Sequence, residues 1–242
     1  MLYLTSKLLE DASVPHGFSL RTGGVSLPPY DTLNLGLSTG DDPGAVAENL
    51  ARLLKAAGLR PEIATANQVH GDRIVDERLR EILPASVDQE EGADALISER
   101  GPVGVRAADC APILLFGGGK VAAAHSGWKG TRLRIAARTV SAMKVPPREV
   151  VAAIGPCIGR CCYEVSPALA AEFRGLFGSR AISGERNLDL RFCIEAALRD
   201  AGVERIEQVP GCTSCDSGSF FSHRRDKGRT GRHLAFIAPI DS

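Results

Sequence analysis

The chain lacks an excess of charge of either sign, and it lacks long apolar runs. Its 242 residues include 29 Lys and Arg and 29 Asp and Glu, so the formal net charge is +0. A neutral chain has no general attraction to nucleic acid or to anionic membranes, and we expect neither as a partner. No apolar run reaches the roughly 20 residues that a transmembrane helix needs. Residues 1–11 have no basic region ahead of an apolar core, which argues against a secretory signal, and we expect a cytoplasmic protein.

Cysteine is present in an odd number, which argues against a framework of disulfides in a reducing compartment. Residues 212–215 form a lone C-x-x-C that no helix pattern directly follows, and no second pair has a clean zinc spacing. We therefore favour neither a redox site nor a structural zinc there. Apart from Cys110, we interpret the cysteines as small buried apolar residues. The seven are Cys110, Cys157, Cys161, Cys162, Cys193, Cys212 and Cys215.

Two short apolar segments flank a run of three glycines near the middle of the chain. Residues 113–116 and 121–124 have the length and composition of buried strands, and residues 117–119 are Gly-Gly-Gly. If the two strands pair antiparallel, the start of the first lies beside the end of the second. This pairing places Cys110, which precedes the first strand, close to His125, which follows the second.

A thiol and an imidazole at one rim can form either a nucleophile pair or part of a metal site. His70, in the segment Asn-Gln-Val-His-Gly, also lies beside a glycine and is a third candidate. One Cys and two His suit a catalytic zinc that keeps one position open for water or substrate. We therefore predict His70, Cys110 and His125 as metal ligands and catalytic residues. Asp94 or Asp109 would orient an imidazole through its second nitrogen.

Basic side chains near glycine-rich turns are candidates for binding phosphate. Arg21 precedes a Gly-Gly turn, Lys129 precedes a helix predicted for residues 131–143, and Arg225 belongs to a basic cluster near the end of the chain. Asn34, downstream of Arg21, is a further candidate substrate contact. The alternative for the basic residues is a solvated loop without a ligand.

The clearest helix pattern covers residues 41–58. Asp42 can cap this helix, Pro43 suits its first turn and Gly58 ends it. Further predicted elements are a strand at 150–154, helices at 167–177 and 188–198, and a charge-rich surface helix or loop at 76–92.

Several segments together resemble those of one known family, in that family's order. They are H-G-F-S-L-R-T-G-G-V-S, N-Q-V-H-G, D-A-L-I-S, A-D-C-A-P-I-L-L, A-A-A-H-S-G-W-K-G-T, I-G-P-C-I-G-R-C-C-Y-E-V and S-H-R-R-D-K-G-R-T-G-R. Over nearly its whole length, the chain resembles the YfiH-type purine nucleoside phosphorylases, long labelled laccase-domain or polyphenol oxidase proteins. The resemblance implies a single α+β domain over residues 1–242, with mixed β-sheets packed between helices in α/β/β/α-like layers.

The resemblance also implies an activity. It predicts a zinc-dependent phosphorolysis of adenosine, inosine, guanosine and methylthioadenosine, with inorganic phosphate as co-substrate, and a deamination of adenosine. It carries the metal ligands over to His70, Cys110 and His125. Purine nucleosides are then the expected binding partners, and the protein is expected to be a monomer or a homodimer.

Three other functions compete with this one. The laccase label implies copper chemistry, but a multicopper cluster needs on the order of ten imidazoles. The chain has five histidines, and none lies in an H-x-H pair, so we disfavour a copper polyphenol oxidase. A thiol hydrolase would use Cys110 as nucleophile and His125 as base, without metal, on a substrate such as a cell-wall precursor. The third alternative is a binding module without catalysis. We disfavour it because it assigns no role to the polar, glycine-marked ends of the strands.

Overall fold

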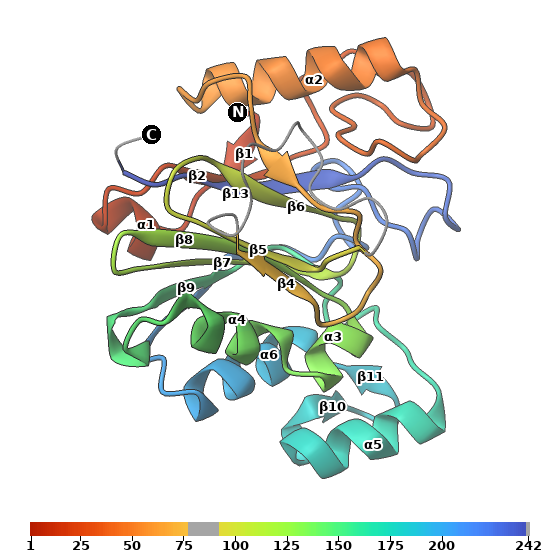
Figure 1. The fold of residues 1–242 in the computed structure, drawn as a ribbon. Helices are drawn as coiled ribbons and strands as arrows, with labels where there is room; N and C mark the ends of the chain where they lie inside the picture. Colours follow the sequence, from red (N-terminus) through yellow and green to blue (C-terminus); the bar gives the residue numbers. More distant parts are fainter. Residues whose placement is uncertain (77–91, 241–242) are drawn as a thin grey trace.

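Two β-sheets lie face to face, and helices cover their outer sides (Figure 1). The computed structural model describes residues 1–76 and 92–240. Helix α2 (Pro43–Ala56) covers the smaller sheet, and most of the remaining helices lie beyond the larger one. The layers are therefore α/β/β/α, which confirms the predicted mixed α+β fold.

The larger sheet has six strands in the order β12-β9-β7-β8-β5-β4. Its two terminal pairs, β12 with β9 and β4 with β5, are parallel, and the inner pairs are antiparallel. The predicted strands at 113–116 and 121–124 fall within β7 and β8, and the one at 150–154 contains β9, which begins one residue later. The bounds are β4 Ile74–Asp76, β5 Ala95–Ser98, β7 Ala111–Gly117, β8 Lys120–Ser126, β9 Val151–Ile154 and β12 Arg205–Gln208.

The central strands of this sheet are apolar along their length because both of their faces are covered. On one face, Leu114, Ala123 and Ala153 belong to the core between the two sheets. On the other face, Ile113 and Ala152 belong to the core beneath the helices. Since successive side chains of a strand point to opposite faces, a continuous apolar run supplies both layers.

The smaller sheet has five strands in the order β1-β2-β13-β6-β3. Its bounds are β1 Tyr3–Leu4, β2 His16–Ser19, β3 Ala64–Thr65, β6 Val103–Ala107 and β13 His233–Ile237. Leu53 and Leu54 of α2 pack against Leu234 and Phe236 on its outer face. The last strand of the chain therefore lies in the middle of this sheet.

Helix α2 begins and ends as its sequence predicts. The Asp42 carboxylate caps it by accepting a hydrogen bond from the backbone N–H of Ala45 at 2.7 Å. Gly58, just beyond the helix, has a φ of +69°, a conformation that glycine adopts without strain.

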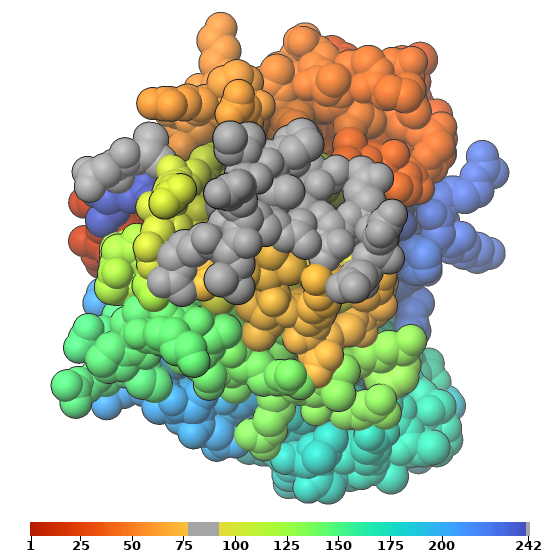
Figure 2. Space-filling view, viewed as in Figure 1, coloured from red at the N-terminus to blue at the C-terminus, as the bar shows by residue number. Residues whose placement is uncertain are grey.

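The helices beyond the larger sheet complete the second outer layer, at the opposite end of the molecule from α2 (Figure 2). The predicted helix at 167–177 coincides with α5, and the one at 188–198 overlaps α6. The remaining elements are α1 Lys7–Asp11, α3 Trp128–Arg132, α4 Ile135–Met143, α5 Pro167–Phe177, α6 Leu190–Asp200, the 3-10 helices η2 Pro147–Glu149 and η3 Ser179–Ala181, and the ribbon β10 Ile182–Ser183 with β11 Asn187–Leu188.

The prediction of one helix over residues 131–143 is wrong in its first turn. Helix α3 already begins at Trp128, and Arg134 interrupts the helix with φ 56° and ψ 40° before α4 starts at Ile135. The Arg134 guanidinium donates to Asp200 at 2.9 Å and lies 5.5 Å from the centre of the Phe177 ring. These contacts accompany the left-handed backbone, which the sequence pattern does not indicate.

Helix α1 lies against β12, the strand at the edge of the larger sheet. The Glu207 carboxylate on β12 accepts hydrogen bonds from the backbone N–H groups of Lys7 at 3.1 Å and Leu8 at 2.8 Å. It also accepts one from the Ser6 hydroxyl at 2.7 Å. A single side chain of the edge strand thus binds the first turn of α1.

The charge-rich residues 76–92, predicted as a surface helix or loop, lie almost wholly outside the described part of the chain. Within the described part, no helix combines the length and the apolar character that a membrane span requires.

Candidate metal centre

The hairpin of β7 and β8 brings a thiol and an imidazole to one rim. Its register pairs Pro112 with His125, so Cys110 lies just beyond the end of β8. The connecting turn uses Gly118 and Gly119 at φ of 56° and 75°, as a tight turn between antiparallel strands requires. The antiparallel pairing predicted from the sequence is confirmed.

His70 joins this pair from the segment that leads into β4. One ligand atom from each of His70, Cys110 and His125 lies within 4.8 Å of the other two. The two imidazole rings are 4.8 Å apart between centres and meet edge to face at 81°. His125 is buried, Cys110 is partly exposed and His70 is exposed, so the group opens to solvent on one side.

Asp94 holds the His125 ring and the loop that carries His70. Its Oδ1 accepts from Nδ1 of His125 at 2.8 Å, and because a carboxylate only accepts, the His125 proton resides on Nδ1. Nε2 of His125 can then bind a metal ion once it has released its own proton. The Asp94 carboxylate also accepts from the backbone N–H groups of Val69 at 3.2 Å, His70 at 3.0 Å and Gly71 at 2.7 Å. One buried carboxylate therefore holds the His70 loop and the His125 ring together.

Two residues of the site have a left-handed backbone, which is uncommon outside glycine. His70 has φ 61° and Asp109 has φ 89°. Such conformations cost about 1–3 kcal/mol each and persist where surrounding contacts fix them. At His70 the contact is the hydrogen bond to Asp94, and Asp109 has its own set of donors.

Asp109 does not bond to an imidazole, although the sequence left that role open for it. Its Oδ1 accepts from the Thr213 hydroxyl at 2.6 Å and the Ser222 hydroxyl at 2.7 Å. Its Oδ2 accepts from the backbone N–H of Arg224 at 2.6 Å. Asp109 thereby ties Cys110, the next residue, to two loops near the end of the chain.

The charges of the site favour an ionised sulfur. Burial opposes ionisation of the Cys110 thiol, but the charges and hydrogen bonds of His125 and His70 outweigh it and lower the Cys110 pKa to about 6. Burial also lowers the pKa of His125, yet Cys110 and Asp94 raise that pKa to about 9. Thiolate and imidazolium stabilise each other as one coupled pair. A thiolate at neutral pH is the form of cysteine that binds a metal ion.

The three candidate ligands suit a divalent ion such as zinc in donor type, number and exposure. Two imidazoles and one thiolate are a ligand set of catalytic zinc sites, which leave a fourth position open. The group lies in a cleft of about 730 Å³ that is lined on its other walls by segments of both sheets. This volume falls within the range of about 300–1,000 Å³ that is usual for small-molecule sites.

Gly127 permits the close approach of the ligands. A Cβ atom at this position would lie 2.7 Å from Cys110 Sγ and 3.6 Å from His70 Cδ2. The backbone of Gly127, with φ −82°, is ordinary, so space alone requires glycine here. The sequence shows this glycine but not what it faces.

The four residues predicted to contact substrate do not line this cleft. The Arg21 guanidinium donates to backbone and side-chain oxygens of Asp31 and to Ser217 O. Arg225 is held by Asp226, Thr213 O and Phe220 O. Both arginines thus fix loops.

Asn34 and Lys129 likewise have other surroundings. Asn34 is fully buried and accepts from the backbone N–H groups of Gly36 at 2.9 Å and Arg232 at 2.8 Å, so it shapes a wall of the cleft from behind. Lys129 lies within α3, with Nζ 5.7 Å from the centre of the Trp128 ring.

Three other arginine side chains line the cleft instead of the predicted ones. Arg106, Arg224 and Arg232 face it, together with Tyr163, over whose ring Arg224 lies at 5.2 Å. Arg106 donates from Nε to Leu35 O at 2.6 Å and from Nη1 to Thr65 Oγ1 at 2.8 Å. Within the described residues, no acceptor engages its Nη2. Arg224 and Arg232 belong to the basic cluster that the sequence shows, whereas Arg106 lies alone within a strand and gives no such indication.

Known proteins share both the sequence and this architecture. The family model described as multi-copper polyphenol oxidoreductase laccase matches residues 15–239. A purine nucleoside phosphorylase of Mycobacterium tuberculosis is 40% identical over 226 residues, which cover 90% of this chain and 88% of the relative. The chain belongs to the YfiH-type purine nucleoside phosphorylase family.

A further relative and a solved structure support the assignment. The purine nucleoside phosphorylase YfiH of Escherichia coli is 37% identical over 228 residues, 90% of this chain and 91% of the relative. The crystal structure of YlmD from Geobacillus stearothermophilus superposes with a TM-score of 0.86 at 31% identity, over 99% of this chain and 96% of that one. The family resemblance predicted from the sequence segments is thereby confirmed.

Proposed function

We propose that the protein is a zinc-dependent purine nucleoside phosphorylase that acts on adenosine, inosine, guanosine and methylthioadenosine and also deaminates adenosine. The observation that carries the proposal is the convergence of His70, Cys110 and His125 within 4.8 Å of one another at the floor of an open cleft. The names of the relatives indicate the class of reaction, and the cleft provides candidate metal ligands and cationic side chains for it.

Phosphorolysis needs a phosphate held against C1′ of the ribose and a stabilised purine leaving group. Arg106, Arg224 and Arg232 give the cleft cationic donors for an anionic co-substrate. The Tyr163 ring offers an apolar surface beside them for the base or the sugar. When bound, zinc supplies Lewis-acid chemistry that polarises a water molecule or a substrate oxygen.

The remaining histidines favour zinc over a copper cluster. His16 is buried, and its Nε2 accepts from the backbone N–H of Ser6 at 2.7 Å. His233 is buried, and its Nε2 accepts from the backbone N–H of Phe221 at 2.8 Å. Of the five histidines, only His70, His125 and the exposed His223 have rings that reach the cleft, far fewer than a multicopper cluster requires.

Replacing Cys110 with alanine tests the proposal. We expect Cys110→Ala to lose the zinc of this site and inosine phosphorolysis together, because the thiolate is one of only three proposed protein ligands. Cys193→Ala, which removes a buried thiol of α6 outside the cleft, is the matched control and should retain both. Retention of zinc at this site and of activity by Cys110→Ala would refute the assignment.

A thiol hydrolase is the second candidate, because Cys110 and His125 also form a nucleophile and base across the hairpin. The two functions differ in their need for metal. If chelation abolishes phosphorolysis and added zinc restores it, the metalloenzyme is supported. If the chelated protein instead forms a covalent adduct at Cys110 with an activated ester and turns it over, the hydrolase is supported.

A further inference from the structure

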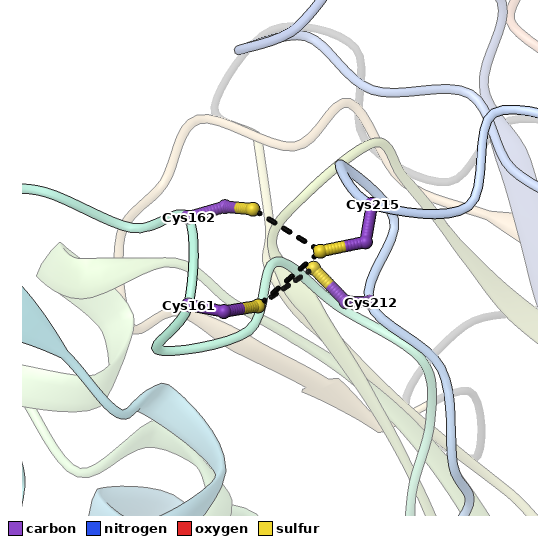
Figure 3. Close-up of side chains that lie close together, drawn as sticks. All are labelled: Cys161, Cys162, Cys212 and Cys215. Atoms are coloured by element: carbon purple, nitrogen blue, oxygen red, sulfur yellow. Dashed lines mark hydrogen bonds between the residues drawn. The ribbon is translucent and has the colours of Figure 1, made fainter.

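Four cysteines from two distant loops lie together outside the cleft. Cys161 and Cys162 belong to the segment between β9 and α5, and Cys212 and Cys215 follow β12 (Figure 3). One sulfur from each lies within 4.8 Å of the other three. Their spacing along the chain does not predict that they meet, since 49 residues separate the two pairs.

The distances between the sulfurs suit one metal ion. Cys215 Sγ is 3.4 Å from Cys161 Sγ and 3.3 Å from Cys162 Sγ, and Cys161 Sγ is 3.6 Å from Cys212 Sγ. Four thiolates at about 2.3 Å from a tetrahedral zinc ion lie about 3.8 Å from one another. The three separations are about 0.2 to 0.5 Å shorter than this value, and all six are at most 4.8 Å. Cys215 Sγ lies at nearly the same distance from two sulfurs, whereas in a disulfide it would be bonded to only one.

Backbone contacts hold the two loops in register around the sulfurs. Cys157 and Cys212 form a parallel β-bridge, and the Thr213 N–H donates to Cys157 O at 3.1 Å. The Gly159 N–H donates to Cys212 Sγ at 3.2 Å, a contact typical of the shell around a metal-bound thiolate. A Cβ atom at Gly159 would lie 3.1 Å from Cys161 Sγ and 3.3 Å from Cys212 Sγ. The loop therefore places a backbone donor and a residue without a side chain against the cluster.

We propose that Cys161, Cys162, Cys212 and Cys215 bind one zinc ion as a tetrathiolate structural site. Zinc prefers four thiolates in tetrahedral geometry when the site is closed to substrate. The arrangement also explains why two exposed cysteines, Cys161 and Cys215, lie side by side on the surface. This site is independent of the zinc proposed for the cleft.

A metal ion here would position two walls of the cleft. Tyr163 directly follows Cys162 and lines the cleft. Thr213 lies between Cys212 and Cys215 and donates to Asp109, the neighbour of Cys110. The cluster thus clamps the loops that carry Tyr163 and Thr213, and its residues act as positioning residues without touching substrate.

Metal stoichiometry tests this proposal. We expect the intact protein, purified under reducing conditions with zinc, to hold two equivalents, and the double variant Cys212→Ser with Cys215→Ser to hold one. Cys110→Ala should lose only the other equivalent, and Cys193→Ala should keep both. With cobalt in place of zinc, the double variant should lose about four-fifths of the sulfur-to-metal charge-transfer absorption, because four of the five bound thiolates belong to this site. An unchanged metal content and absorption in the double variant would overturn the proposal.

A second measurement uses the unaltered protein, so it does not depend on how the variants fold. Alkylation followed by peptide mapping should find Cys161, Cys162, Cys212 and Cys215 protected in the zinc-loaded protein and reactive after chelation. Full alkylation before chelation, or disulfides among them in the zinc-loaded protein, would refute the site. Phosphorolysis can be absent while these cysteines remain protected, so failure of the proposed function is distinguishable from failure of this inference.

Discussion

The Asp94 carboxylate accepts a hydrogen bond from Nδ1 of His125 at 2.8 Å while both residues are buried. The same carboxylate accepts three backbone N–H groups of the loop that carries His70. Although burial raises the pKa of Asp94, the hydrogen bonds from His125 and from this loop lower it on balance. Asp94 is therefore an ionised anchor for two of the three proposed ligands.

Removing the charge of Asp94 should weaken the metal site. An Asp94→Asn side chain places an N–H₂ group where either the His125 ring or the loop N–H groups donate, so one set of contacts is lost. We expect zinc affinity to fall about 10- to 100-fold, as measured by competition with a chromophoric chelator. Asp72→Asn, which removes a partly exposed carboxylate paired with Arg138, is the control and should change little. Equal affinities for the two variants would contradict the anchoring role.

Adding a methyl group at Gly127 should disturb the ligands without straining the backbone. The Cβ atom of Gly127→Ala would meet Cys110 Sγ at 2.7 Å, so the sulfur must move away from the position that it shares with the imidazoles. We expect lower zinc affinity and at least tenfold lower phosphorolysis, a loss of the size that misplaced ligands cause. Gly175→Ala in α5, whose Cβ would meet nothing within 4 Å, should retain both properties. Normal zinc binding by Gly127→Ala would show that the ligands do not depend on this close approach.

Phosphate recognition should depend on the cleft arginines. We expect Arg232→Gln to raise the KM for phosphate about tenfold, the value of one charge-assisted hydrogen bond. Initial rates at varied phosphate and saturating inosine provide the measurement. Arg21→Gln should lower thermal stability, because Arg21 fixes the loop of Asp31, but leave this KM unchanged. If Arg21→Gln raised the KM for phosphate and Arg232→Gln did not, the result would support the sequence-based prediction that Arg21 binds phosphate.

His233 should make the protein sensitive to mild acid. Burial lowers the pKa of His233 from 6.5 to about 4, and its Nε2 must remain unprotonated to accept from Phe221. Between these pH values the unfolded chain binds a proton that the folded chain excludes, so the free energy of unfolding falls as pH decreases from 6.5 to about 4. The shift corresponds to about 3 kcal/mol.

Denaturant unfolding across this pH range measures the effect. His233→Gln can still accept from Phe221 but cannot be protonated, so its pH dependence should be weaker. His16, whose pKa burial also lowers, contributes in the same direction and leaves a residual slope. An identical slope for the variant and the parent protein would exclude His233 as the source.

The sequence predicts the parts of this molecule whose determinants are local. Asp42, Pro43 and Gly58 fix the ends of α2, and the three glycines after β7 fix the hairpin that joins Cys110 to His125. The left-handed Arg134 makes its side-chain contacts with residues more than 40 positions away, which a local helix pattern does not contain.

The cysteine spacing does not predict the four-cysteine cluster, for a related reason. β9 and β12 are parallel neighbours, so the loops that follow them run side by side and bring the two cysteine pairs together. The spacing of cysteines along the chain contains no information on which strands are neighbours. Arg106 was missed likewise, because a lone arginine in a strand gains meaning only from the cleft that it faces.

The hydrogen bonds between Glu207 and the first turn of α1 lie at the edge strand of the larger sheet, where strands of other chains could add. A strand at the margin of a sheet presents free backbone groups on which another chain can assemble into larger aggregates. Here the first turn of α1 is fastened to β12, and that strand bears Arg205 and Glu207 as charged side chains. Charged side chains on such a strand disfavour the addition of a strand from another chain.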